Sequence, residues 1–323
     1  LVSVGTVTAQ LLYEIGSPAY INPDVVSHFD TLKIEETDKD RVYVSGCRGS
    51  TPPPTHKACI NLAGGFRNGM EIIITGLDIE EKAKSFTDTL FKSLGGVEQF
   101  DEVSMELHQT QKDNPSSNEE AMASLALSVK SMNPDLVGRM FSAKIIELSL
   151  ASYPGFFARS AFKANGPVIV YWPALIDSKH IKEIVYVDGK EIEVLPTNQL
   201  NLEEKYYQKE PIEILDAPKG NLQLVHFGEL YGTRSGDKGG CANLGIWAKD
   251  NLSYSFLYEF LTVDKLKELL PDLSEFKIDR YDLSNIKSLN FYIHDILQDG
   301  ISSNNKKDGQ AKSLGEYLRA KLI

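Results

Sequence analysis

The residues best suited to chemistry form one glycine-rich stretch, residues 234–240. Its glycines free backbone N–H groups to converge, and Arg234, Ser235 and Lys238 add side-chain donors that suit an anion. A phosphate, a carboxylate or an oxyanion could bind there, while Asp237 could hold Lys238 or act as a base. We therefore predict Asp237 and Lys238 as catalytic residues, and as anion ligands Arg234, Ser235, Gly236, Gly239, Gly240 and Asn243.

The spacing of this stretch matches no standard catalytic motif. It is neither a Walker phosphate loop nor a G-x-S-x-G elbow, so Ser235 is not assigned as a nucleophile. The competing interpretation is a tight turn between two strands, with Arg234 and Asp237 paired locally. Both interpretations remain open at the level of sequence.

A second candidate for anion binding surrounds the prolines at positions 52–54. Consecutive prolines hold the backbone stiff and extended, which would present Arg48 and Lys57 in a fixed geometry. Both side chains suit a carboxylate or a phosphate. Alternatively, the segment is a rigid surface loop whose basic residues balance Asp38 and Asp40.

A third candidate combines Tyr13, Glu14, Asn22 and Asp24. A carboxylate beside an amide and a phenol could transfer protons. However, the Asn-Pro-Asp sequence at positions 22–24 is also typical of an ordinary turn or helix cap, and we favour that interpretation.

The sequence gives no indication of a metal or a cofactor. Its six histidines are scattered without ligand spacing, and its three cysteines form no C-x-x-C pair. His226 and His294 lie in expected strands, and we interpret both as structural histidines. No G-x-G-x-x-G fingerprint follows a strand. We therefore expect neither a metal nor a cofactor.

Composition excludes several classes of partner. The 323-residue chain has a formal net charge of -11 and a sequence pI of about 5.1, which would repel a phosphate backbone. No apolar run approaches the roughly 20 residues needed to cross a bilayer, and the first residues lack the order of a signal peptide. We expect a cytoplasmic protein that binds neither nucleic acid nor membranes.

Hydrophobic periodicity indicates the elements that must position these residues. It predicts helices at 78–94, 116–132 and 133–148. Apolar and β-branched runs predict strands at 41–45, 58–62, 70–75, 103–108 and 168–172. The best local hairpin joins 184–187 to 191–195 through Asp188-Gly189. This order predicts a mixed α/β first domain over residues 1–196.

A polar, acidic segment at 197–221 is the predicted linker to a second domain at 222–323. Strands are expected there at 222–227, 242–248, 276–283 and 289–293, and helices at 254–260, 263–270 and 311–322. The chain is thus predicted to be an α+β protein of two domains, of which the second is a small two-layer unit.

Two groups of motifs carry a resemblance to a known family. The first comprises TVTAQLLYE at 6–14, SPAYINPDV at 17–25, DRVYVSGCRG at 40–49, PPPTHK at 52–57 and GGF at 64–66. The second comprises TRSGDKGGCANLG at 233–245, RY at 280–281 and LNF at 289–291. In order and spacing, the chain resembles the acyclic terpene utilisation (AtuA) family from about residue 6 to residue 318.

The resemblance implies an AtuA domain followed by a ferredoxin-fold-like α/β sandwich that holds the second group of motifs. Family members usually carry a long N-terminal half with its own glycine-rich motifs, and this sequence lacks it. We therefore expect residues 1–196 to be the C-terminal part of an AtuA domain. We also expect an apolar face or sheet edge on the first strands, exposed or covered by another chain, and a homo-oligomer.

The basic segments and the family together predict a catabolic protein that binds or transforms an anionic, branched acyl substrate, such as a coenzyme A thioester. An enzymatic step would be addition, elimination or proton transfer beside a carbonyl. Lys238 and Arg48 would then stabilise anionic oxygen while Asp237 moves a proton. The alternative is a non-catalytic ligand-binding or assembly module, because the sequence shows no nucleophile or metal constellation.

Overall fold

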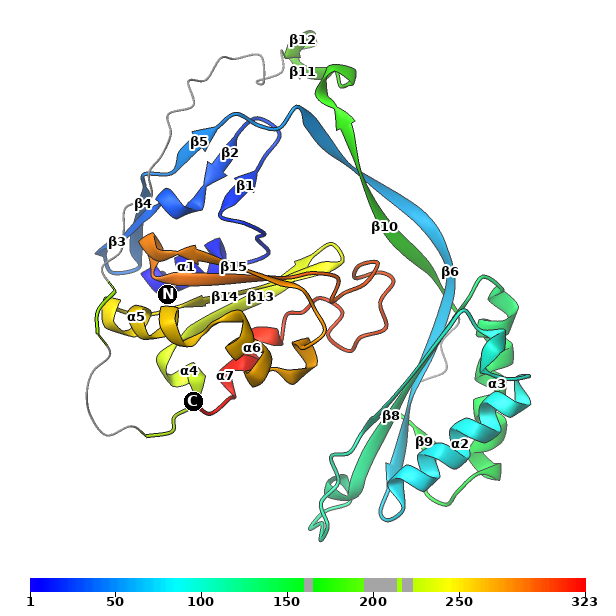
Figure 1. Ribbon diagram of the computed structural model, residues 1–323. Coiled ribbons are helices and arrows are strands. Elements are labelled where there is room, and N and C mark those ends of the chain that lie inside the picture. The colour runs from blue at the N-terminus through cyan, green and yellow to red at the C-terminus, as the bar shows by residue number, and fades with distance from the viewer. Residues whose placement is uncertain (160–164, 195–213, 217–222) are drawn as a thin grey trace. The chain divides into compact units, whose positions relative to one another are not determined.

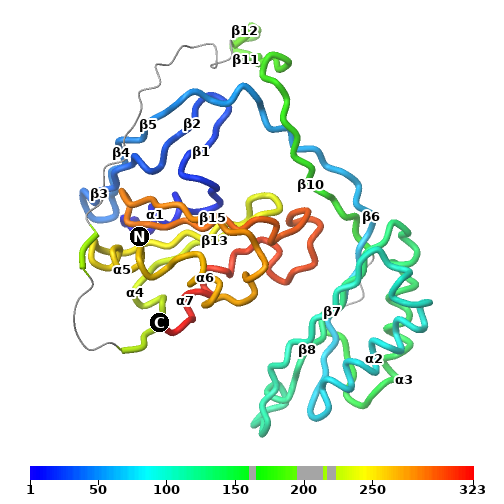
Figure 2. The backbone as a smooth tube through the Cα atoms, in the orientation of Figure 1, coloured from blue at the N-terminus to red at the C-terminus, as the bar shows by residue number. Residues whose placement is uncertain are grey.

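A computed structural model describes residues 1–159, 165–194, 214–216 and 223–323 of the chain. It contains two units: unit 1 comprises residues 1–60 and 171–323, and unit 2 comprises residues 61–170. Figure 2 traces the backbone of both, and both chain termini belong to unit 1. Two long paired strands, β6 (Thr55–Thr75) and β10 (Gly166–Asp177), contribute to both units. The combination of helices with antiparallel sheets confirms the predicted α+β class.

The centre of unit 1 is a four-stranded antiparallel sheet (Figure 1). Its strands follow the spatial order β13-β14-β16-β15. They are β13 (Gly232–Lys238), β14 (Cys241–Trp247), β15 (Ile278–Leu283) and β16 (Ser288–Ile293). Because side chains alternate along a strand, one face of this sheet is apolar and the other is polar.

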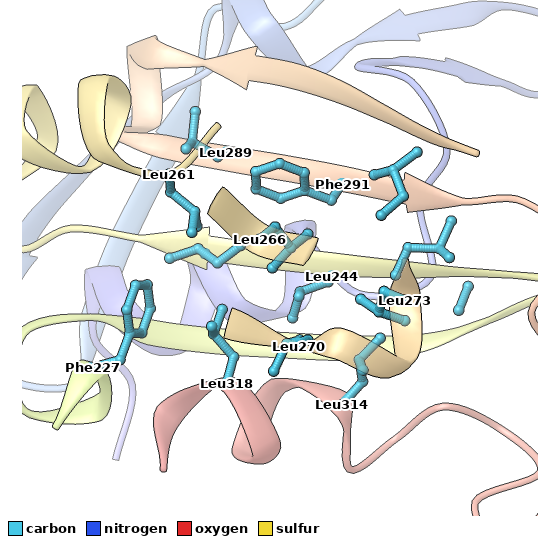
Figure 3. Close-up of a cluster of buried hydrophobic side chains, with 14 of the residues drawn as sticks. Phe227, Leu244, Leu261, Leu266, Leu270, Leu273, Leu289, Phe291, Leu314 and Leu318 are labelled. Atoms are coloured by element: carbon cyan, nitrogen blue, oxygen red, sulfur yellow. The ribbon is translucent and has the colours of Figure 1, made fainter. Parts of the chain in front are cut away.

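The apolar face packs against helices. These are α4 (Phe227–Leu230), α5 (Asn251–Phe260), α6 (Val263–Leu269) and α7 (Leu314–Arg319). Figure 3 shows the resulting core, in which Leu244 of β14 and Phe291 of β16 lie with Leu318 of α7, all fully buried. This two-layer arrangement confirms the predicted ferredoxin-like sandwich.

The polar face is covered by the beginning of the chain. Helix α1 (Val4–Leu11) begins at a capping box on Ser3 and lies against β13 and β14. The segment that follows buries Leu12 and Ile15 in a small second cluster with Leu32 and residues of the β15–β16 connection. Residues from the two ends of the sequence therefore share one unit.

Further strands of unit 1 form three small sheets. One has the order β1-β2-β5, another pairs β3 with β4, and the predicted hairpin pairs β11 with β12. Their bounds are β1 (Ala19–Ile21), β2 (Val26–His28), β3 (Lys33–Asp38), β4 (Arg41–Ser45), β5 (Arg48–Ser50), β11 (Glu183–Val187) and β12 (Lys190–Val194). Single apolar side chains are exposed in these strands and in β6, namely Ile21, Tyr43, Val44 and Ile60.

Unit 2 is an antiparallel sheet with two helices packed on it. The order is β10-β6-β8-β7, with β9 beside β6. The bounds are α2 (Ile79–Ser93), β7 (Glu102–His108), β8 (Met122–Ser131), α3 (Phe141–Ala151) and β9 (Phe157–Ala158). Phe86 of α2, Phe141 of α3 and Val129 of β8 meet in one core.

Among the residues that the structure describes, no helix combines the length and apolar character that crossing a membrane requires.

The structure differs from the expected elements in three places. The helix expected at 116–132 is a short turn followed by β8, because Ala123, Leu125, Leu127 and Val129 are buried at a spacing of two rather than three or four. The strand expected at 222–227 is confirmed only in part: backbone hydrogen bonds pair residues 225–227 with residues 321–323, and α4 begins at Phe227. The glycine-rich stretch at 234–240 is a tight turn between two strands, as in the competing interpretation: residues 232–238 form β13, and Gly239 and Gly240 make the turn. Most of the predicted linker at 197–221 lies outside the described residues.

Gly245 allows the beginning of the chain to approach the sheet, which gives a test of this packing. A Cβ atom at Gly245 would lie 2.6 Å from the Leu12 Cβ, whereas a Cβ at Gly166 would meet nothing within 4 Å. We expect Gly245→Ala to lower the free energy of unfolding by about 1–3 kcal/mol, because overpacked cores cost that much. Gly166→Ala should leave it nearly unchanged. Urea unfolding followed by Trp247 fluorescence in a Trp172→Phe background would measure both, and equal stabilities would contradict the packing.

Candidate functional site

The polar face of the four-stranded sheet brings predicted residues together in rows. Antiparallel register places Lys238 opposite Cys241, Gly236 opposite Asn243, and Arg234 opposite Gly245. Directly opposed residues lie on the same face of a sheet. On the next strand, Asn290 and Tyr292 continue the same face beyond Gly245 and Asn243.

Two buried asparagines on this face hold the segment at residues 12–16. Asn243 and Asn290 are each 0% exposed. The Asn243 amide donates to the Leu12 carbonyl at 2.6 Å and to Asn290 Oδ1 at 2.9 Å, and its Oδ1 accepts from the Glu14 N–H at 2.8 Å. The Asn290 amide donates to the Gly16 carbonyl at 2.6 Å. Asn243, predicted as an anion ligand, is thus occupied by the protein's own backbone.

Glu14 is held in an unusual backbone conformation. Its φ of 55° lies in the left-handed region, which is uncommon for residues other than glycine. A Cβ atom at Gly236 would come within 2.7 Å of the Glu14 Cγ and 2.8 Å of a Tyr13 ring carbon. Gly236 therefore makes room for these two side chains.

Three positive side chains surround Tyr13 and Glu14. The guanidinium of Arg234 lies 4.2 Å from the centroid of the Tyr13 ring, within cation–π range. The Lys312 ammonium contacts the Tyr13 hydroxyl and lies 2.9 Å from Glu14 Oε1. Lys238 is near enough for its positive charge to lower the pKa of Glu14. We call Tyr13, Glu14, Arg234, Lys238 and Lys312 the cationic cradle.

The two lysines of the cradle have pKa values shifted in opposite directions. Hydrogen bonds to Tyr13 and Glu14 raise the pKa of Lys312. Burial lowers the pKa of Lys238, and the nearby charge of Lys57 lowers it further, against opposing effects of Glu14 and Asp237. Shifts in opposite directions between neighbouring groups of the same type are frequent at functional sites, because burial and charged neighbours are arranged differently around each group.

Aromatic rings accompany the basic side chains of the cradle. Lys238 lies 5.2 Å from the Tyr20 ring centroid, and Lys57 lies 5.9 Å from that of Tyr171. Lys57, from the second predicted candidate, is close enough to Lys238 for its charge to lower the pKa of Lys238. Arg48 lies in β5, where its backbone N–H donates to the Thr31 hydroxyl.

Two of the predicted residues lie on the other face of β13. Ser235 is 3% exposed, donates to the Lys312 carbonyl at 3.2 Å and accepts from the Gly315 N–H at 2.9 Å. Its hydroxyl thus ties the start of α7 to the sheet. Asp237 points to the same side as Ser235 because residues two apart share a face. Asp237 and Lys238 therefore lie on opposite faces of the strand.

Sequence reasoning missed part of the cradle. Lys312 stands 298 positions from Glu14, and no motif marks it, so only the fold reveals the contact. Tyr13 and Glu14 belong to the third candidate of the sequence analysis, for which we favour an ordinary turn or helix cap over a proton-transfer site. For Asn22 the turn interpretation is confirmed, since its N–H donates to the Val25 carbonyl between β1 and β2. In the described ranges, no three His, Cys, Asp or Glu side chains gather to hold a metal.

The ionisation of Glu14 gives a pH-dependent test of the cradle. Burial raises the pKa of Glu14, but hydrogen bonds from Tyr13 and Lys312 outweigh burial and leave the pKa below its ordinary value of 4.5. The carboxylate therefore stabilises the fold fully above pH 4.5, and this contribution is lost as the pH falls through the lowered value. We expect the stability difference between wild type and Glu14→Gln to shrink on acidification.

Urea unfolding at neutral pH and at a pH of about 3 would measure that difference. Lys312→Gln should reduce the pH dependence of stability only in part, because it removes one donor to the Glu14 carboxylate and leaves Tyr13 as the other. A constant difference across this range would contradict the ion pair.

Comparison with known proteins identifies both parts of the chain. The model of the acyclic terpene utilisation family protein AtuA matches residues 1–187. The model of the AtuA ferredoxin-like domain matches residues 225–323, which include the four-stranded sheet. No curated protein and no solved structure matches the chain. These matches confirm the resemblance seen in the motifs.

Proposed function

The chain belongs to the acyclic terpene utilisation (AtuA) family, and from that premise we propose that its cationic cradle binds the negatively charged group of an acyl compound. The group would be a free carboxylate or part of a coenzyme A thioester. The family is named for the use of branched hydrocarbons, whose breakdown generally proceeds through acyl compounds. The site, rather than the family name, supports the charge and the position of the ligand.

The observation that carries the proposal is an excess of positive charge on one sheet face. The cradle has three positive side chains and one carboxylate, in a chain whose formal net charge is -11. Lys57 adds a like charge that acts on Lys238. Keeping ammonium groups together is costly without a counter-charge, and a bound anion would remove that cost.

Tyrosine rings supply surface for the uncharged part of the ligand. Tyr20 lies beneath Lys238 and stacks on Phe29 at a centroid distance of 5.3 Å. Tyr171 lies near Lys57 and borders the turn at Gly239. Flat rings with polar edges suit an apolar chain that ends in a charged group. A branched acyl group fits this description.

The chemical role follows from which residues share the face. Lys238 is a partly buried donor that could stabilise a carbonyl oxygen as it becomes negative. Arg234 and Lys312 would hold the substrate's permanent charge. Asp237 lies on the opposite face, so a base acting on the same substrate is better sought elsewhere on the polar face.

Calorimetric titration with 3-methylbutanoate, its coenzyme A thioester, free coenzyme A and phosphate tests the proposal. We expect the carboxylate or the thioester to bind, and Lys238→Met to weaken that binding by about tenfold or more, since a charged hydrogen bond contributes about 1.5–3 kcal/mol.

The matched control is Lys265→Met, because Lys265 pairs with Glu268 on α6, on the helical side of the sheet. It should bind like wild type. Undetectable binding of every compound, or equal affinities for Lys238→Met and wild type, would contradict the proposal.

The lowered pKa of Lys238 predicts proton uptake on binding. An anion favours the ammonium form, so it raises the pKa that burial lowers, and the complex takes up protons at alkaline pH, where free Lys238 is partly deprotonated. Affinity should therefore fall as the pH rises toward the lowered value, below the ordinary 10.5. Titrations at alkaline pH in two buffers of different ionisation enthalpy would detect the uptake. Heats that do not depend on the buffer, or whose dependence persists in Lys238→Met, would contradict it.

A further inference from the structure

A histidine–aspartate pair lies on the same polar face as the cradle. His294 follows β16 two positions after Tyr292 and four after Asn290, so all three share a face. The backbone N–H of His294 donates to the Lys277 carbonyl at 3.0 Å, so the chain at His294 still pairs with the segment before β15. Asp279 of β15 stands opposite Tyr292. The sequence marked His294 only as structural.

The pair has the geometry of an oriented base. His294 Nε2 lies 2.7 Å from Asp279 Oδ2. This hydrogen bond outweighs burial and holds the pKa of Asp279 below its ordinary value, so the carboxylate stays charged. A carboxylate on one ring nitrogen fixes the proton there and leaves the other nitrogen, Nδ1, as a proton acceptor. The side chains are 27% and 35% exposed, so a ligand can reach the ring.

Neighbouring groups position the ring. The edge of the imidazole meets the Tyr292 ring at 90°, with centroids 4.9 Å apart. Burial raises the pKa of Tyr292, and a hydrogen bond with Cys241 raises it further, so this phenol stays protonated. Other titratable groups also face the pair. Lys277 Nζ lies 3.8 Å from Asp279 Oδ1, and burial together with the charge of Asp279 raises the pKa of Tyr281. Tyr281 and Asp295 contribute to the raised pKa of Tyr292.

Strand register connects the pair to the cradle. Cys241 lies opposite Lys238 on one side, and on its other side β14 pairs with β16, which leads to His294. Lys238 and His294 thus flank one intervening strand at the same end of the sheet. Two strand spacings amount to roughly 10 Å, a distance that a lysine and a histidine side chain can span with a small acyl group between them.

We infer that His294, oriented by Asp279, is the base that removes a proton from the carbon beside the carbonyl of the acyl compound bound at the cradle. The inference rests on the proposed function. The C–H bond breaks, its electron pair moves into the carbonyl to form an enolate, and the proton goes to His294 Nδ1. Lys238 stabilises the enolate oxygen, and Asp279 stabilises the imidazolium. Return of the proton restores the substrate, so no further reactant is needed.

Deuterium exchange tests this step without knowledge of the full reaction. The full chain is incubated in D₂O with 3-methylbutanoyl-coenzyme A, and loss of the proton signal beside the carbonyl is followed by NMR. We expect wild type to accelerate exchange, and His294→Gln to slow it by about 100-fold or more while binding is kept, because a positioned base contributes about 10²–10⁴-fold.

Asp279→Asn provides a second variant that preserves size. It should slow exchange less than His294→Gln and shift the pH profile of exchange, which a purely structural role would not do. Lys277→Gln removes the other charged neighbour of Asp279 and should exchange like wild type.

Binding is measured by calorimetry in the same samples, which separates this inference from the proposed function. A wild type that binds the thioester without accelerating exchange overturns the role of His294 and leaves the proposed function standing. A wild type that does not bind overturns both. Equal exchange in His294→Gln and wild type also overturns the inference.

Discussion

The buried amide pair Asn243–Asn290 is the interaction on which the site depends. An unpaired buried amide costs about 1–3 kcal/mol, so two fully buried asparagines in the middle of a sheet face require partners. They find them in the Leu12 and Gly16 carbonyls and the Glu14 N–H. The requirement thus draws residues 12–16 onto strands more than two hundred positions away, and burial of Leu12 and Ile15 in the small second cluster adds to this anchoring.

Once the segment is fixed, the chemistry of the face follows from strand geometry. Period-two alternation sends Leu244 and Phe291 into the helical core and leaves Arg234, Lys238 and His294 on the polar side. Gly236 of β13 leaves space for Tyr13 and Glu14, and Gly245 of β14 leaves space for Leu12. Positive charge then comes from side chains, with Lys312 added by the loop before α7. One small sheet thereby combines a hydrophobic core and a charged face.

Sequence reasoning succeeded where the signal is local. The periodicity around Phe86 identified α2, and Asp188-Gly189 identified the β11–β12 hairpin. Sequence reasoning failed where pairing with a distant segment determines the local structure. The capping pattern at Ser116 predicts a helix, but the residues that follow form strand β8, which pairs with β6. The glycine-rich motif forms strand β13 and a two-residue turn, and the pairing of β13 with β14 decides between the two interpretations that the sequence left open. Lys312 could not be found at all, because its partners are brought near only by folding.

Hydrogen exchange at a single amide tests the account most directly. The Glu14 N–H lies outside any helix or strand, yet its donation to a buried side chain should make it exchange as slowly as the amides of β14. In an Asn243→Leu variant that keeps the sheet folded, this protection should disappear at Glu14 while the amides of β14 remain protected. If the Glu14 N–H of wild type exchanges as fast as an amide in an open loop, residues 12–16 are not held on the sheet. That result would contradict the arrangement of the site.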